Sequence, residues 1–113
     1  MIILNRSKNA VIANKAQMAD TFPSRMTGLL KHKELAQNEA LIITRCNSIH
    51  MFFMKFAIDV IFINKANKVV GLVKNIQPNH LSPIYWSATK AIELPVGIIS
   101  STHTELGDDI LFE

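Results

Sequence analysis

The chain has 113 residues, 49% of them hydrophobic and 19% charged, with a net charge of +3. This composition supports a globular core and argues against disorder, and no apolar run reaches the roughly 18 residues of a membrane-spanning helix. The N-terminus lacks the features of a signal peptide and the single cysteine, Cys46, cannot form an intrachain disulfide, so we expect a cytoplasmic protein. The length fits a single domain over residues 1–113.

The first third of the chain predicts two short strands and one helix. The strands cover residues 1–4 and 10–13. Asp20 or Thr21 can cap a helix, and Pro23 suits its first turn because the missing N–H has no helical partner there. Four apolar side chains at spacings of three and four share one face of this amphipathic helix: Phe22, Met26, Leu29 and Leu30.

The remaining two thirds predict a series of short strands. Their expected ranges are 40–44, 57–63, 68–73, 90–94 and 109–112. Residues 64–67 are polar and include asparagines that tolerate positive φ, so the second and third strands are expected to form a hairpin. Residues 78–83 read as a proline-containing loop. We therefore predict an α+β, predominantly β domain, with a barrel-like or curved antiparallel sheet and one or two short helices.

The segment from Cys46 to Phe62 is the strongest site candidate, because it places polar groups inside an apolar run. Cys46, His50 and Met54 are spaced by four. In a helix they lie about 6 Å apart and could share a soft metal, whereas in a strand they lie roughly 13 Å apart and could not. A Cys46 nucleophile with His50 as base is a further possibility, but no third group or oxyanion hole accompanies it. Core packing is the structural alternative for all three.

Two carboxylates interrupt apolar strands and need partners. Asp59 and Glu93 are each flanked by aliphatic residues, so each requires a cation or backbone donors unless it is protonated. Arg25 and Arg45 are the candidate cations. Such a pair serves either as an anion clamp with a perturbed acid or as an internal ion pair that fixes strand register.

Charge and aromatic residues give weaker indications. The first 33 residues carry six basic side chains and one acidic one, and the acidic residues gather near the C-terminus. No basic cluster interleaves with aromatic residues along the sequence, which argues against single-strand nucleic-acid binding. The Tyr85-Trp86 pair either lines a pocket mouth or covers the core.

Four ordered motifs resemble a widespread uncharacterised microbial family, the domain of unknown function family 192. They are Arg25-Met26-Thr27-Gly28-Leu29, the run from His50 through Met54 to Ile58-Asp59-Val60-Ile61-Phe62, the segment Ile92-Glu93-Leu94-Pro95-Val96-Gly97, and Gly107-Asp108. The resemblance implies a small, mostly β domain that occurs both in the cytoplasm and exported. It implies no activity, cofactor or catalytic residue.

The sequence thus favours a non-enzymatic binding or accessory domain with a polar groove. The expected groove residues are Arg25, His50, Met54, Asp59 and Glu93. No cofactor is expected, the partner is unknown, and no membrane insertion is expected. The alternatives are an enzyme that uses Asp59 or Glu93 as acid or base, a weak nucleic-acid binder, and a soft-metal binder through Cys46, His50 and Met54.

Overall fold

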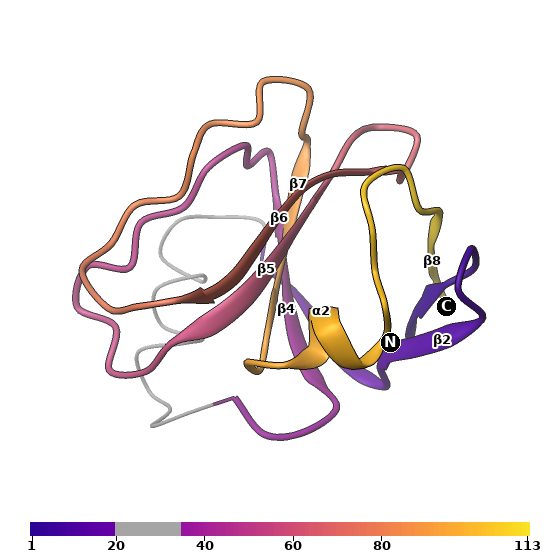
Figure 1. Cartoon of the computed structure of the whole chain (residues 1–113), viewed down its shortest axis with the longest axis horizontal. Coiled ribbons are helices and arrows are strands. Elements are labelled where there is room, and N and C mark those ends of the chain that lie inside the picture. Colours follow the sequence, from indigo (N-terminus) through magenta and orange to yellow (C-terminus); the bar gives the residue numbers. More distant parts are fainter. Residues whose placement is uncertain (20–34) are drawn as a thin grey trace.

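In the computed structural model, two β-sheets pack against each other (Figure 1); residues 1–19 and 35–113 are described. The smaller sheet has the order β2-β1-β8 and consists of β1 (Ile3–Asn5), β2 (Ala10–Ala13) and β8 (Ile110–Phe112). The larger sheet has the order β3-β4-β7-β5-β6 and consists of β3 (Lys15–Ala19), β4 (Glu39–Thr44), β5 (Ile58–Ile63), β6 (Val69–Ile76) and β7 (Lys90–Leu94). One short helix, α2 (Ile98–Ser101), follows β7.

The strand pairs are antiparallel except for β3 and β4, which are parallel. The β5–β6 hairpin is confirmed. Its turn places Asn67 at φ 60, and the side chain of Asn64 accepts hydrogen bonds from the N–H groups of Ala66 and Lys68. Asparagine tolerates this left-handed backbone better than most residues, so the polar turn sets the hairpin.

Two apolar clusters cover the two faces of the larger sheet. The first lies between the sheets and includes Ile3 and Ile12 from the smaller sheet, with Ile61 and Leu94 from the larger one. The second lies on the opposite face and is covered by connecting segments rather than by a third sheet. Every residue of β5 is buried, so both faces of this strand are inside, which explains why all its residues except Asp59 are apolar.

The predicted α+β, mostly β class with curved sheets is confirmed, although the sheets do not close into a barrel. Two elements were missed, the strand β3 and the helix α2. The amphipathic helix predicted after the Asp20 or Thr21 cap lies outside the described residues. Within residues 1–19 and 35–113, no helix has the length and apolar character needed to cross a membrane.

Candidate functional site

Two connections run side by side and form what we call the loop ribbon, residues 45–57 and 77–89 (Figure 1). The first joins β4 to β5 and the second joins β6 to β7. Five backbone hydrogen bonds link them, from the N–H of Cys46 to Thr89 (3.1 Å), of Tyr85 to Asn47 (2.8 Å), of Ser82 to Ile49 (3.0 Å), of Met51 to His80 (2.9 Å) and of Asn79 to Met51 (2.8 Å). The two loops are therefore antiparallel and mutually supported, although neither forms a strand beyond the isolated bridge between His50 and Leu81.

The inner side of the ribbon covers the second apolar cluster. Cys46, Ile49 and Met51 are buried there against the sheet. The ring of Tyr85 lies 4.7 Å from that of Phe62, centroid to centroid, so Tyr85 covers the core. This inward packing fixes the position of the ribbon, because the buried side chains leave few alternative arrangements.

The outer side of the ribbon exposes large apolar side chains. The exposed fraction reaches 76% for Phe53, 67% for Leu81 and 82% for Trp86. Phe52 and Ile84 are also exposed, and the ring of His50 stacks on that of Phe52 with centroids 5.0 Å apart. Single exposed apolar residues are ordinary, but a group of five on two hydrogen-bonded loops is typical of a binding surface.

A hollow of about 310 Å³ opens between the two loops. It is lined by Ser48, Ile49, His50, Leu81, Ser82 and Ile84. Its aliphatic walls carry two hydroxyls and an imidazole, and the hydroxyl of Ser82 already accepts the N–H of Ile49 at 2.9 Å. Apolar walls with a few placed polar groups are the usual composition of a small binding pocket.

Phe53 adopts a backbone conformation that bulky residues avoid. Its φ is 67°, at the third position of a turn closed by the N–H of Met54 and the carbonyl of Met51 (3.2 Å). Glycine or asparagine suits this position, and a non-glycine residue there costs about 1–2 kcal/mol. Since the exposed ring gains little burial in return, the strain points to a role outside the fold.

Asp59 has a structural role in this arrangement. Its carboxylate is 1% exposed at the residue level and accepts three backbone N–H groups, from Asn75 (2.9 Å), Gly97 (3.1 Å) and Ile99 (3.0 Å). The last two belong to the first turn of α2, where N–H groups have no partner within the helix. Asp59 therefore joins three segments and is not open to a substrate.

Glu93 lies on the other face of the sheet. Strand pairing places Asp59 opposite Leu94 and Glu93 opposite Val60, and neighbouring positions along a strand point to opposite faces. Leu94 belongs to the first apolar cluster and Val60 to the second. The two carboxylates therefore do not share a site. Arg25 lies outside the described residues, so its pairing with either carboxylate stays a prediction.

Cys46, His50 and Met54 occupy neither a helix nor a regular strand. Cys46 is buried and its thiol donates to the carbonyl of Ser48 at 3.1 Å, His50 stacks on Phe52, and Met54 packs against the second cluster. Within residues 1–19 and 35–113, no group of three or more His, Cys, Asp or Glu side chains is arranged to hold a metal ion.

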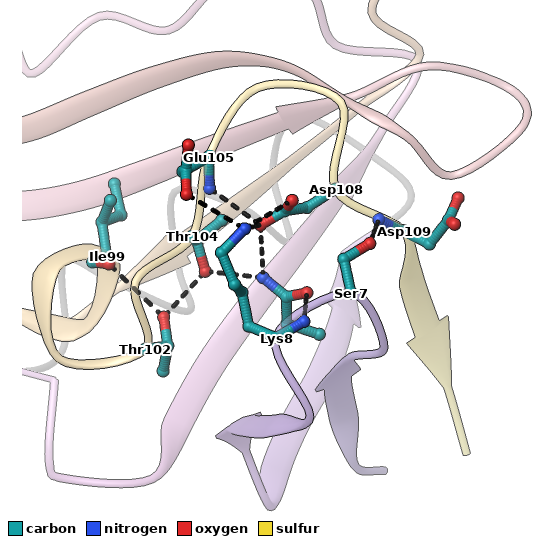
Figure 2. A network of polar contacts seen from close by, with 9 residues as sticks. Ser7, Lys8, Ile99, Thr102, Thr104, Glu105, Asp108 and Asp109 are labelled. Carbon is teal, nitrogen blue, oxygen red and sulfur yellow. Dashed lines mark hydrogen bonds and ion pairs between the residues drawn. The ribbon is translucent and has the colours of Figure 1, made fainter.

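A polar network occupies the other end of the molecule, where the N-terminal hairpin meets the C-terminal segment (Figure 2). The buried Asn5 donates to Thr104 and Asp108, both at 3.0 Å. The ammonium of Lys8 lies 2.9 Å from a carboxylate oxygen of Asp108 and 3.1 Å from Glu105. Satisfied polar networks of this kind hold distant segments in one arrangement, and we assign this one to folding.

The network shifts the pKa values of both partners. Burial opposes ionisation of Asp108, but the hydrogen bonds from Asn5, the Glu105 N–H and Lys8 outweigh it and lower its pKa below 3.8. The hydrogen bond to Asp108, opposed by desolvation and aided by Glu105, raises the pKa of Lys8 above 10.5. Both shifts favour the charged pair at neutral pH.

A second hollow of about 340 Å³ lies beside the start of β5 and the end of β7. It is lined by Leu35, Gln37, Phe56, Ala57, Pro95 and Val96. None of these side chains is titratable, and Val96 is the one strongly exposed large apolar residue among them. The loop ribbon is therefore the stronger candidate site.

The fold and the ribbon together define a small β-rich domain with a preformed apolar surface. The chain belongs to the domain of unknown function family 192, described as Uncharacterized ACR, whose model matches residues 2–112. An uncharacterised UPF0127 protein of Thermococcus sibiricus is 38% identical over 118 residues, covering 99% of this chain and 75% of its relative.

Two crystal structures share the fold. A protein of unknown function from Novosphingobium aromaticivorans superimposes with a TM-score of 0.82 at 20% identity, covering 98% of this chain and 82% of that one. A candidate transcription regulator from Sinorhizobium meliloti gives 0.80 at 16% identity, covering 97% and 89%. At these identities the likeness establishes the fold alone.

Of the residues expected to form a groove, the structure places His50 at the hollow and Met54 next to Phe53. The carboxylate of Asp59 accepts an N–H of α2, and Glu93 points to the opposite face of the sheet. Sequence reasoning missed Phe53, Leu81 and Ile84 as surface groups. The available signal was the clustering of apolar residues in a segment too irregular for a strand, beside the prolines at 78 and 83.

Proposed function

We propose that this protein is a non-catalytic binding module and that the outer face of the loop ribbon is its binding surface. The observation that carries the proposal is the exposed group around the hollow between His50 and Leu81. Association buries apolar surface, and exposed aromatic and aliphatic side chains on a rigid support lose little entropy when a partner covers them.

Catalysis has less support from the geometry. The carboxylate of Asp59 is buried and accepts backbone N–H groups, and it does not face Glu93 across a cleft. An acid or base must reach the proton it transfers, directly or through one water. A binding surface needs no such group, so the ribbon is sufficient for the proposed role.

Panning of a random peptide library tests the proposal with a matched pair of variants. Leu81 and Leu106 are 67% and 66% exposed, but only Leu81 lies on the ribbon. We expect wild type and Leu106→Ser to enrich the same peptide families and Leu81→Ser to lose them. Both substitutions should change the free energy of unfolding by less than about 0.5 kcal/mol, because both side chains are exposed.

The absence of enriched peptides on wild type, or equal enrichment on Leu81→Ser, would contradict the proposed function. Circular dichroism and thermal unfolding of all three proteins provide the control for folding. A loss of binding in Leu81→Ser counts only if its unfolding transition matches that of wild type.

We also propose that the protein works in the cytoplasm. Its one cysteine, Cys46, is buried and forms no disulfide, whereas small secreted domains often depend on disulfides. Detection with an antibody after cell fractionation tests the location. Recovery in the cytoplasmic fraction supports it, and recovery outside the cell or with membranes contradicts it.

A further inference from the structure

The charge of the loop ribbon has one sign. The two loops contain two cations, Arg45 and Lys55, and the one acidic residue within residues 44–90, Asp59, is buried under backbone donors. Neither loop of the ribbon contains an aspartate or glutamate. The ribbon thus presents apolar side chains and cations without an anion of its own.

One lysine borders the apolar group. Lys55 lies on the first loop, two residues after Phe53, and is exposed. It forms no ion pair within residues 1–19 and 35–113. Lys8 and Lys68, by contrast, pair with the C-terminal acids Glu105, Asp108 and Asp109 (Figure 2 shows the Lys8 group).

We propose that the partner is an acidic linear segment of another protein, with an apolar side chain in the hollow and a carboxylate beside Lys55. This inference rests on the proposed function and specifies the chemistry of its partner. Complementary charge at the rim of an apolar contact speeds association and selects among partners.

The shape of the site favours a peptide over other anionic partners. The hollow has aliphatic walls from Ile49, Leu81 and Ile84, which suit one apolar side chain. Single-stranded nucleic acid would stack its bases on the exposed rings of Phe52, Phe53 and Trp86 and leave the aliphatic hollow unfilled. An anionic bilayer would receive the same protruding side chains and also leave the recess between the two loops unfilled.

Synthetic versions of the enriched peptides test the charge requirement. We expect these peptides to combine leucine or aromatic residues with Asp or Glu. Replacement of their acids by Asn or Gln should weaken binding about three- to tenfold, and replacement by Lys should weaken it further. Affinity for the acidic form should fall as salt is raised.

A pair of single variants provides the matched control on the protein. Lys55→Glu should lower affinity for the acidic peptide about three- to tenfold, mainly through slower association. Lys65→Glu changes the net charge equally, at an exposed lysine outside the two loops, and should leave affinity within about twofold.

The outcomes separate the two proposals. If the amide peptides bind as tightly as the acidic ones, the charge inference is overturned and the binding surface stands. If no peptide binds wild type, the proposed function itself fails. Tighter, Leu81-dependent binding of an oligothymidylate, or of phosphatidylserine vesicles, would overturn the acidic-peptide inference in favour of that partner.

Discussion

Asp59 and Glu93 stand one register position apart on the paired strands β5 and β7, and their side chains leave the sheet on opposite faces. The carboxylate of Asp59 reaches α2, while Glu93 is buried on the face that the loop ribbon covers. Two acidic residues in neighbouring apolar strands thus have separate surroundings. The sequence alone does not reveal this difference, because both acidic residues are flanked by aliphatic residues.

Removal of the Asp59 carboxylate should destabilise the fold. Asp59→Ala leaves the buried N–H of Ile99 and the partly buried N–H of Gly97 without acceptors, and we expect a loss of about 3 kcal/mol in the free energy of unfolding. Asp59→Asn retains one acceptor oxygen and should cost about 1–2 kcal/mol. Asp109→Asn is the control: its ion pair with Lys68 is half exposed and should matter by less than about 1 kcal/mol. Denaturant unfolding measures all three.

Gly71 should be sensitive to a single methyl group. A Cβ there would lie 2.5 Å from the ring of Tyr85, so Gly71→Ala must displace the ring that holds the ribbon. We expect a loss of about 1–3 kcal/mol. In a Tyr85→Ala background the same change should cost less than about 1 kcal/mol, since the clash is gone. Equal costs in both backgrounds would show that the ring is not the cause.

Replacement of Phe53 should stabilise the fold and weaken binding. Phe53→Asn relieves the left-handed strain at φ 67°, so we expect the free energy of unfolding to rise by about 0.5–1 kcal/mol while peptide affinity falls about tenfold or more. Phe52→Asn is the neighbouring control, because Phe52 is not at positive φ and stacks on His50. That variant should lose stability. A Phe53→Asn protein that is less stable than wild type would contradict the strain argument.

The Lys8–Asp108 pair predicts how stability depends on pH. Because the pKa of Asp108 is lowered, its contribution to the free energy of unfolding is present above pH 3.8. This contribution is lost as the pH falls through the pKa that Asp108 has in the folded protein. The raised pKa of Lys8 means that its contribution is present below 10.5 and is lost at higher pH. Asp108→Asn should therefore cost about 1.5–3 kcal/mol near neutral pH and much less in acid. Unfolding measured at both pH values tests this, and a cost independent of pH would argue against the ionised pair.

Much of the fold could be predicted from local signals. The predicted strand at residues 10–13 begins and ends where β2 does in the structure, and the asparagines of the β5–β6 turn indicate the hairpin. These features depend on neighbouring residues, so they are legible without the tertiary structure. The strand β3 was missed because its buried residues, Ala16 and Ala19, are alanines that do not alternate with the exposed ones, so Lys15–Ala19 carries no strong strand signal. Its parallel pairing with β4 is a long-range contact.

The candidate site was harder to predict than the fold. The spacing of Cys46, His50 and Met54 is compatible with a helix or a strand. In the structure the run from Cys46 to Ala57 forms a loop that is held by hydrogen bonds to residues 79–89. Which side chains of such a segment face outward depends on those contacts and not on a period in the sequence. The sequence predicts that Asp59 needs donors, and among the described residues these are the backbone N–H groups of Asn75, Gly97 and Ile99 rather than an arginine.

The two outermost segments of the chain bond to each other: the N–H of Ile2 donates to the carbonyl of Glu113 at 2.7 Å and the N–H of Glu113 donates to that of Ile2 at 2.8 Å. Figure 1 shows both ends at one side of the molecule and the long loops at the opposite side. A tether or fusion attached at either end would therefore leave from the same corner. It would hold the domain with its aromatic loops turned toward the surrounding solution, free to meet a partner.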